Sequence, residues 1–271
     1  MSIVQSLIDN FFEYLLVIVN APLQPLFGLV QNLISEPVNI SIFGSLWAIM
    51  VYILSLFYGL LLLYAGFNFI ISGHDIVKRE NAKTWLRNVM VMTVLIQASF
   101  FLYFLVVEIS SLLTTGVLGL IDPNFFLFTF DNFVNIGLEF IFGITYIFTL
   151  LLTTILLTVR YLIVSIGVVL MPIAIFFYFI PPLNSYGRLI LNFVGVCIFI
   201  TFLDAIVLLA GSKLIGLALF QNFKILVVIS SFSLANLLMS YAMFFAIARS
   251  ALNTAIGVKG KVGVLKALVG A

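Results

Sequence analysis

Three charged residues lie inside long apolar stretches of this sequence: Arg160, Asp204 and Glu108. A charge at bilayer depth is costly, so such residues usually pair and face a protein interior or a water-filled path. With a helical rise of about 1.5 Å per residue, Asp204 lies about 22 Å from the predicted inner face, and Arg160 and Glu108 about 30 Å. These depths predict that Arg160 contacts Asp204 or Glu108. The pair would line a lumen or subunit interface, or would fix helix packing.

Recognisable motifs for other chemistry are missing from the sequence. It contains no glycine-rich phosphate loop, no H-E-x-x-H motif and no triad spacing around a serine or cysteine. His74 is the only histidine, and Cys197 is the only cysteine, which excludes an internal disulfide. We therefore expect no catalytic residue, no metal site and no cofactor, and we predict that the chain is not an enzyme.

Basic residues gather in one short charged segment, the loop predicted from Gly73 to Arg87. Its members are Lys78, Arg79, Lys83 and Arg87, and the part from Glu80 to Arg87 is predicted to be helical. One interpretation is an ordinary solvated loop that marks the cytoplasmic side of a membrane protein. The other is a docking surface for a cytoplasmic partner.

The elements that must position these residues follow from composition. The chain of 271 residues is 64% hydrophobic and 8% charged, and its mean hydropathy is +1.31. A soluble domain has about 45–50% apolar and about 25% charged residues. The apolar runs are long and unbroken, whereas the strands of a membrane barrel alternate apolar and polar residues. The sequence therefore predicts an all-α, polytopic integral membrane protein in contact with lipid.

Three segments are expected along the chain. Residues 1–38 form N-terminal interfacial helices, in which an amphipathic helix from Ile3 to Val19 is broken by Pro22 and Pro25. Residues 39–249 form the transmembrane domain, and residues 250–271 form a short basic cytoplasmic tail. The predicted apolar stretches are Ile42–Ser72, Val89–Leu118, Asn132–Ile180, Leu189–Gly211 and Ile225–Ala248.

The number of crossings depends on Asn132–Ile180, which is much longer than the roughly 20 residues that one crossing needs. Pro172 is predicted to kink this stretch, and Pro181-Pro182 to end it. No turn-forming residues surround Thr158–Tyr161, so one crossing here, and five in total, is favoured over six. Five crossings put nine of the 12 basic residues inside, with the N-terminus outside and the C-terminus in the cytoplasm. Lys224 would then reach the outer surface.

Two stretches resemble a known family. The first runs Tyr64-Ala65-Gly66-Phe67-Asn68-Phe69, then Lys78-Arg79, Ala82-Lys83 and Trp85-Leu86, and continues through Gln97 to Glu108. The second combines Arg160-Tyr161, Met171-Pro172-Ile173-Ala174, Phe179-Ile180-Pro181-Pro182-Leu183, Tyr186-Gly187 and Asp204. Together they resemble the TrbL-type polytopic membrane subunit of type IV secretion and conjugation systems, in particular the archaeal branch that includes the CedA component of DNA import. The resemblance covers roughly Tyr64 to Lys213.

The resemblance implies a platform or channel subunit of a DNA-transfer apparatus in the cell membrane. It implies partners as well: further copies of the chain, a hexameric secretion-type ATPase, a small pilin subunit and, at the channel, translocated DNA. Two other classes of protein have different requirements, and of these the transporter is the alternative. A small-molecule secondary transporter would show internal repeats and broken helices, and a membrane-embedded enzyme would need clustered His, Asp or Glu residues, which the sequence lacks.

Overall fold

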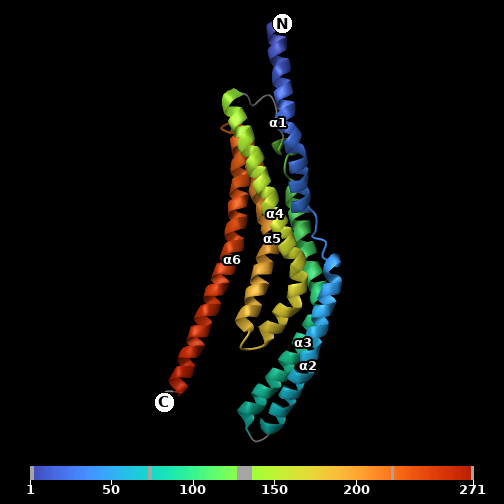
Figure 1. Cartoon of the computed structure of the whole chain (residues 1–271), viewed down its shortest axis with the longest axis vertical. Helices are drawn as coiled ribbons and strands as arrows, with labels where there is room; N and C mark the ends of the chain where they lie inside the picture. The colour runs from blue at the N-terminus through green and yellow to red at the C-terminus, as the bar shows by residue number, and fades with distance from the viewer. Residues whose placement is uncertain (1–2, 73–74, 127–135, 221–222, 270–271) are drawn as a thin grey trace. The chain divides into compact units, whose positions relative to one another are not determined.

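The structure is a computed structural model of the whole chain. It describes the backbone of residues 3–72, 75–126, 136–220 and 223–269. Side chains are described for most of these residues, but not for most residues before Leu23, nor for 123–124, 136–140, 247 and 249–269. The described chain is helical, without strands, in the order α1 (Ile3–Ser35), η1 (Ser41–Phe43), α2 (Gly44–Ile71), α3 (Ile76–Leu118), η3 (Pro123–Phe126), α4 (Ile136–Phe179), α5 (Asn184–Ile215) and α6 (Lys224–Val269) (Figure 1).

Among the residues that the structure describes, five helices are long and apolar enough to cross a membrane. The spans are Ser41–Ile71, Ile76–Leu118, Ile141–Phe179, Asn184–Ile215 and Lys224–Ala246. The chain is therefore a multi-pass membrane protein, as its composition predicts. α4 runs without a turn through Thr158–Tyr161, so the hairpin that a sixth crossing would need is not there.

Two compact units share the helices, and most long helices contribute to both. The first unit contains Met1–Pro37, Ile109–Tyr161 and Phe199–Ala242. The second contains Val38–Glu108, Leu162–Ile198 and Met243–Ala271. This division cuts across the three consecutive segments expected from the sequence, and that expected segmentation stays a prediction.

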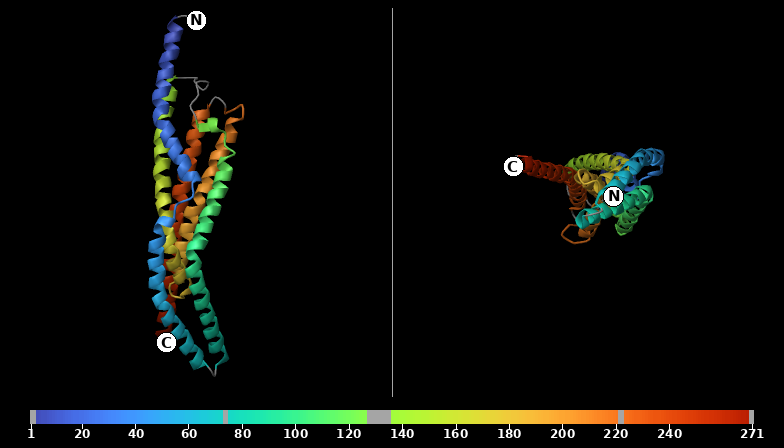
Figure 2. Two further views of the ribbon diagram at one scale, coloured as in Figure 1. Left: turned by 90° about the vertical axis from the view of Figure 1, so that its right-hand side faces the viewer. Right: turned by 90° about the horizontal axis from the view of Figure 1, so that it is seen from below.

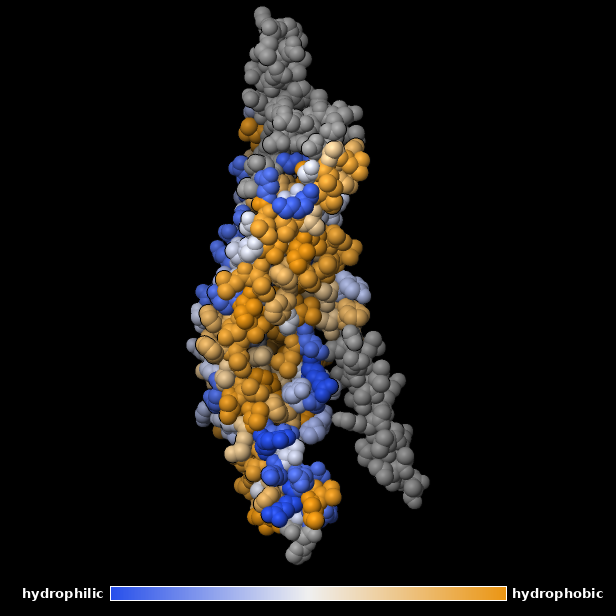
Figure 3. Space-filling model, turned by 180° about the vertical axis from the view of Figure 1, so that it is seen from behind, coloured by the Kyte–Doolittle hydropathy of each residue, from blue (hydrophilic) through white to orange (hydrophobic). Residues whose placement is uncertain are grey.

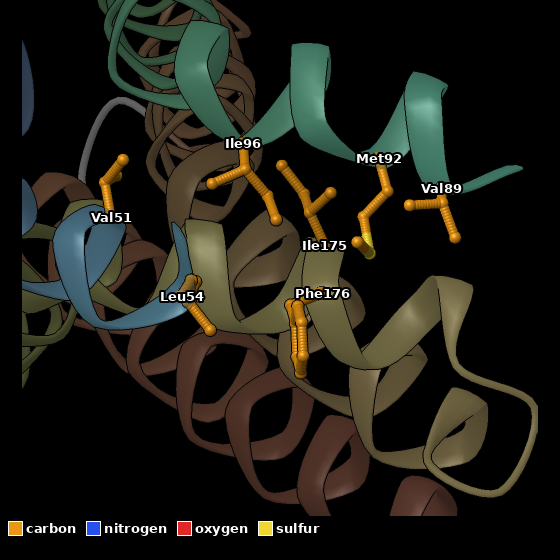
Figure 4. Packing of buried hydrophobic residues seen from close by; sticks show 7 residues of the cluster. All are labelled: Val51, Leu54, Val89, Met92, Ile96, Ile175 and Phe176. Carbon is orange, nitrogen blue, oxygen red and sulfur yellow. The ribbon is translucent and has the colours of Figure 1, made fainter. Parts of the chain in front are cut away.

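The core of the second unit joins α2, α3 and the last turns of α4. Figure 4 shows its buried members, which come from these three helices: Val51, Leu54, Val89, Met92, Ile96, Ile175 and Phe176. Trp47 of α2 donates its indole N–H to the hydroxyl of Ser99 in α3 at 2.8 Å. α2, which ends at Ile71, and α3, which begins at Ile76, lie side by side (Figures 1 and 2). They form the hairpin that carries the predicted basic segment.

The first unit is held by polar contacts between helix backbones and small side chains. The hydroxyls of Ser111 and Thr115 in α3 donate to the carbonyl of Ser35 at the end of α1, at 2.8 Å and 3.2 Å. Asn236 of α6 donates to the carbonyl of Thr149 in α4 at 3.4 Å. Such bonds are common between membrane helices, because small residues allow close approach and lipid offers no competing partner.

The prediction that Pro22 and Pro25 break the first helix is wrong, because α1 continues from Ile3 to Ser35. A proline inside a helix costs about 3 kcal/mol. Beyond the prolines, α1 is held by the two hydroxyl bonds to the Ser35 carbonyl and by the Phe27 ring, whose centroid lies 4.2 Å from that of Phe126. The predicted amphipathic face from Ile3 to Val19 lies mostly outside the residues whose side chains are described.

The predicted loop from Gly73 to Arg87 is also corrected, because α3 begins at Ile76. Asp75 starts the helix: its Oδ1 accepts the backbone N–H groups of Val77 at 3.0 Å and Lys78 at 3.3 Å. Aspartate at this position satisfies donors that have no partner within the helix. The basic residues therefore stand on a helix continuous with a membrane span. At the other end of the chain, the backbone of the predicted tail continues α6 to Val269.

Candidate functional site

Two charged residues predicted to meet are both buried in the first unit. Arg160 on α4 is 4% exposed and Asp204 on α5 is 1% exposed. The charge of Arg160 acts on the Asp204 carboxylate, yet neither Asp204 oxygen accepts a hydrogen bond from the described residues. The two charges therefore interact within the first unit. Their direct contact stays a prediction, as does a contact of Arg160 with Glu108, which belongs to the second unit.

A second charged residue is buried where the sequence predicted exposure. Lys224, predicted to reach the outer surface, begins α6 and is only 9% exposed. The charge of Asp122 acts on it, and the backbone N–H of Asp122 donates to the hydroxyl of Ser212 at 3.4 Å. A nearby opposite charge makes burial of a lysine tolerable. The sequence did contain a signal for this interaction, because Asp122 follows one span, Lys224 precedes another, and both span ends are predicted on the same side of the membrane.

The four basic residues predicted as a docking surface have different environments. Lys78 pairs with Asp75 at 3.4 Å. The guanidinium of Arg79 lies 5.6 Å from the centre of the Phe69 ring, within cation–π range. Lys83 and Arg87 are exposed and make no hydrogen bond or ion pair with other described residues. In Figure 3 hydrophilic residues gather at the end of the hairpin, next to the apolar surface of the helices.

A cavity of about 490 Å³ opens beside this basic segment, within the second unit. Its walls come from the end of α2, the start of α3 and the turn between α4 and α5. The polar lining residues are Asn68, Ser72, Lys78, Asn81 and Trp85, and Pro181 and Pro182 close one side. The cavity unites the two stretches that carry the family resemblance. Their spacing in the sequence gave no sign that they meet, because more than 90 residues separate Trp85 from Pro181.

Several groups on this cavity lack a hydrogen-bond partner. The side-chain amides of Asn68 and Asn81 make no hydrogen bond with the described residues, and the buried Trp85 Nε1–H makes none either. Across the cavity wall, Trp85 meets Tyr64 edge to face, with ring centroids 6.3 Å apart. Most buried polar groups have a partner, so the buried Trp85 N–H is available to a bound group. Asn81 is exposed and Asn68 half-buried, which leaves both amides open to water or to a ligand.

Pro172 lies inside α4, which continues on both sides of it, and its role as a kink stays a prediction. Among the described residues no group of three or more His, Cys, Asp and Glu side chains could hold a metal ion. His74 lies outside the described residues.

Comparisons of the chain with models of known protein families, with curated proteins and with solved structures found no match.

Proposed function

We propose that this chain is a membrane platform or channel subunit of a type IV secretion-like DNA-transfer apparatus. The observation that carries the proposal is the α2–α3 hairpin, on which Lys83 and Arg87 stand exposed without an ionic partner among the described residues. Because α3 is continuous from this surface into a membrane span, a partner bound here would be coupled to the membrane domain through a rigid element.

The partners that suit this function are further copies of the chain, a hexameric secretion-type ATPase and a small pilin subunit, with DNA as the cargo. An exposed cationic surface fits an acidic surface on the ATPase, since opposite charges steer and orient such encounters. The family resemblance of the sequence supports the same assignment. Among the described residues no cluster of His, Cys, Asp and Glu side chains could hold a metal ion. In the proposed apparatus the ATPase supplies the energy for transfer.

The test is a charge reversal in the source cells, with K83E and R87E combined in the chromosomal copy. K213E is the matched control, because Lys213 is an exposed basic residue in the last turn of α5. We expect the double variant to insert normally, to lose DNA transfer between cells and to lose co-purification of an ATPase identified by mass spectrometry. The control should retain both. Normal DNA transfer by K83E/R87E would contradict the docking role and leave the segment as a topology signal.

A small-molecule secondary transporter is the second candidate, and the buried Asp204 favours it. Ionisable residues inside membranes frequently serve as ion or proton relays, and this carboxylate lacks a hydrogen-bond partner among the described residues. D204N separates the two functions. Loss of proton- or sodium-driven solute uptake by purified protein in liposomes, with DNA transfer intact in cells, would favour the transporter.

A further inference from the structure

The two helices of the α2–α3 hairpin have opposite chemical character at their shared end. α2 contains no charged residue in its 28 positions. It stays apolar and exposed through its last turns, where Leu63 is 57%, Phe67 57% and Ile70 76% exposed. The neighbouring turns of α3 carry the basic residues. One side of the hairpin end therefore suits acyl chains, and the other suits water and anions.

Helix length places this end at the headgroups of a bilayer. A 28-residue helix is about 42 Å long, whereas the hydrocarbon core is about 30 Å thick and the bilayer about 40–45 Å thick with its headgroups. The last turns of α2 must then reach the headgroup layer even though they remain apolar. Trp85 lies four residues before Val89, where the apolar part of α3 begins. Tryptophan is enriched at this interface.

The cavity lies at this boundary between the apolar and charged sides. Its polar lining includes several donors: the Lys78 ammonium, the NH₂ groups of Asn68 and Asn81, the Tyr64 hydroxyl and the Trp85 N–H. No carboxylate lines it. Asp75 offsets part of the Lys78 charge from outside the cavity, but an ammonium has three donors and can bond to a second anion at the same time.

We propose that this cavity binds the anionic headgroup of a phospholipid, with the acyl chains on the exposed apolar face of α2. The phosphate takes hydrogen bonds from Lys78, Asn68 and Asn81. A free phosphate ion has the same headgroup chemistry but makes no use of the apolar wall. The inference goes beyond the proposed function, since it concerns Lys78 and the cavity rather than the exposed Lys83 and Arg87.

The two tryptophans of the chain give a direct readout. Trp47→Phe leaves Trp85 as the single tryptophan, at the cavity itself, and excitation at about 295 nm avoids the ten tyrosines. The full chain in neutral detergent is titrated with short-chain phosphatidylglycerol, with phosphatidylcholine of the same chains and with inorganic phosphate. We expect a saturable change in Trp85 emission with phosphatidylglycerol only. Native mass spectrometry of the unaltered chain, counting retained lipid, gives an independent measurement if the Trp47 variant folds poorly.

Lys78→Gln and Lys83→Gln form a matched pair, because both remove one charge from the same helix and only Lys78 lines the cavity. K78Q should weaken phosphatidylglycerol binding about tenfold, the usual scale for a lost hydrogen bond to a charged group, and K83Q less than twofold. Asp75→Asn should strengthen binding, because it releases the Lys78 charge.

Three results would overturn the proposal. Equal weakening by K78Q and K83Q would mean general surface attraction. Equal binding of phosphatidylcholine would mean that the headgroup charge is not recognised. Saturation by inorganic phosphate at the same concentration would make the site one for free anions. None of these results depends on DNA transfer, so the platform function and the lipid site fail independently.

Discussion

The hydroxyl of Tyr103 in α3 donates a hydrogen bond of 2.6 Å to the backbone carbonyl of Val164 in α4. The Tyr103 ring is 1% exposed and lies directly against Gly167, one turn further along α4. A Cβ at Gly167 would stand 3.1 Å from Tyr103 Cζ and 3.0 Å from a methyl group of Val194, and closer still to the Tyr103 hydroxyl. Gly167 is therefore what allows α3 and α4 to approach closely within the second unit.

Gly167→Ala is expected to lower the free energy of unfolding by about 1–3 kcal/mol, the usual cost of overpacking a filled site. Gly59→Ala is the matched control, because its Cβ would meet nothing within 4 Å. It should be neutral or slightly stabilising. In a Tyr103→Phe background the hydroxyl is gone, so G167A should cost less than in the original chain. Unfolding in mixed micelles measures all three, and an unchanged cost would contradict the contact.

Two effects of Asp75, the capping of α3 by its side-chain oxygen and its negative charge, can be measured separately. Asp75→Ala removes the acceptor for the N–H groups of Val77 and Lys78 and should cost about 1 kcal/mol. Asp75→Asn keeps the cap and removes only the ion pair with Lys78. Because that pair is exposed on both sides, D75N should change stability by less than about 0.5 kcal/mol. Helicity and unfolding in micelles distinguish the two, and an equal loss from both variants would show that charge, not capping, starts α3.

The fold class could be predicted because lipid imposes a simple rule. A run such as Ile42–Ser72, with no charged residue, has one stable outcome in a bilayer, which is a helix. Helix ends were less predictable. Pro22 and Pro25 suggested a break because local propensity opposes a helix there, whereas tertiary contacts at Phe27 and Ser35 decide the outcome. Asp75 shows the reverse case, since its cap is a local signal that the predicted Gly73–Arg87 loop overlooked.

The candidate site was predicted only in part. The basic residues from Lys78 to Arg87 stand out in the sequence because charge is rare in this chain. The cavity could not be predicted, since it depends on how Pro181-Pro182 packs beside Asn68 and Trp85, and such tertiary placement leaves no periodic signal. The burial of Lys224 was not predicted for the same reason, because the opposite charge that acts on it belongs to Asp122, about a hundred residues away.

The orientation of the chain is testable with single cysteines in a Cys197→Ala background. Five crossings with the basic residues inside would place Lys83 and Lys266 on the cytoplasmic side and Lys213 on the other, and this is the orientation we predict. A membrane-impermeant maleimide should label K213C in intact cells, and K83C and K266C only after permeabilisation. The two cytoplasmic positions serve as controls for each other. Labelling of K83C and K266C from opposite faces would contradict an odd number of crossings.

We predict that Arg160 pairs with Asp204, and a double-mutant cycle on protein stability tests this. Removing one partner of a buried charge pair leaves the other charge uncompensated, at a cost of about 3–5 kcal/mol, whereas replacing both with apolar groups is often neutral or stabilising. R160L and D204L should therefore each destabilise the chain in micelles, and the double variant should recover most of the loss. Coupling arises because the charge of Arg160 acts on this carboxylate in the first unit.

R160L/E108L is the control cycle, which tests the alternative partner in the second unit. Additive losses in the Asp204 cycle together with strong coupling in the Glu108 cycle would assign Arg160 to Glu108 instead.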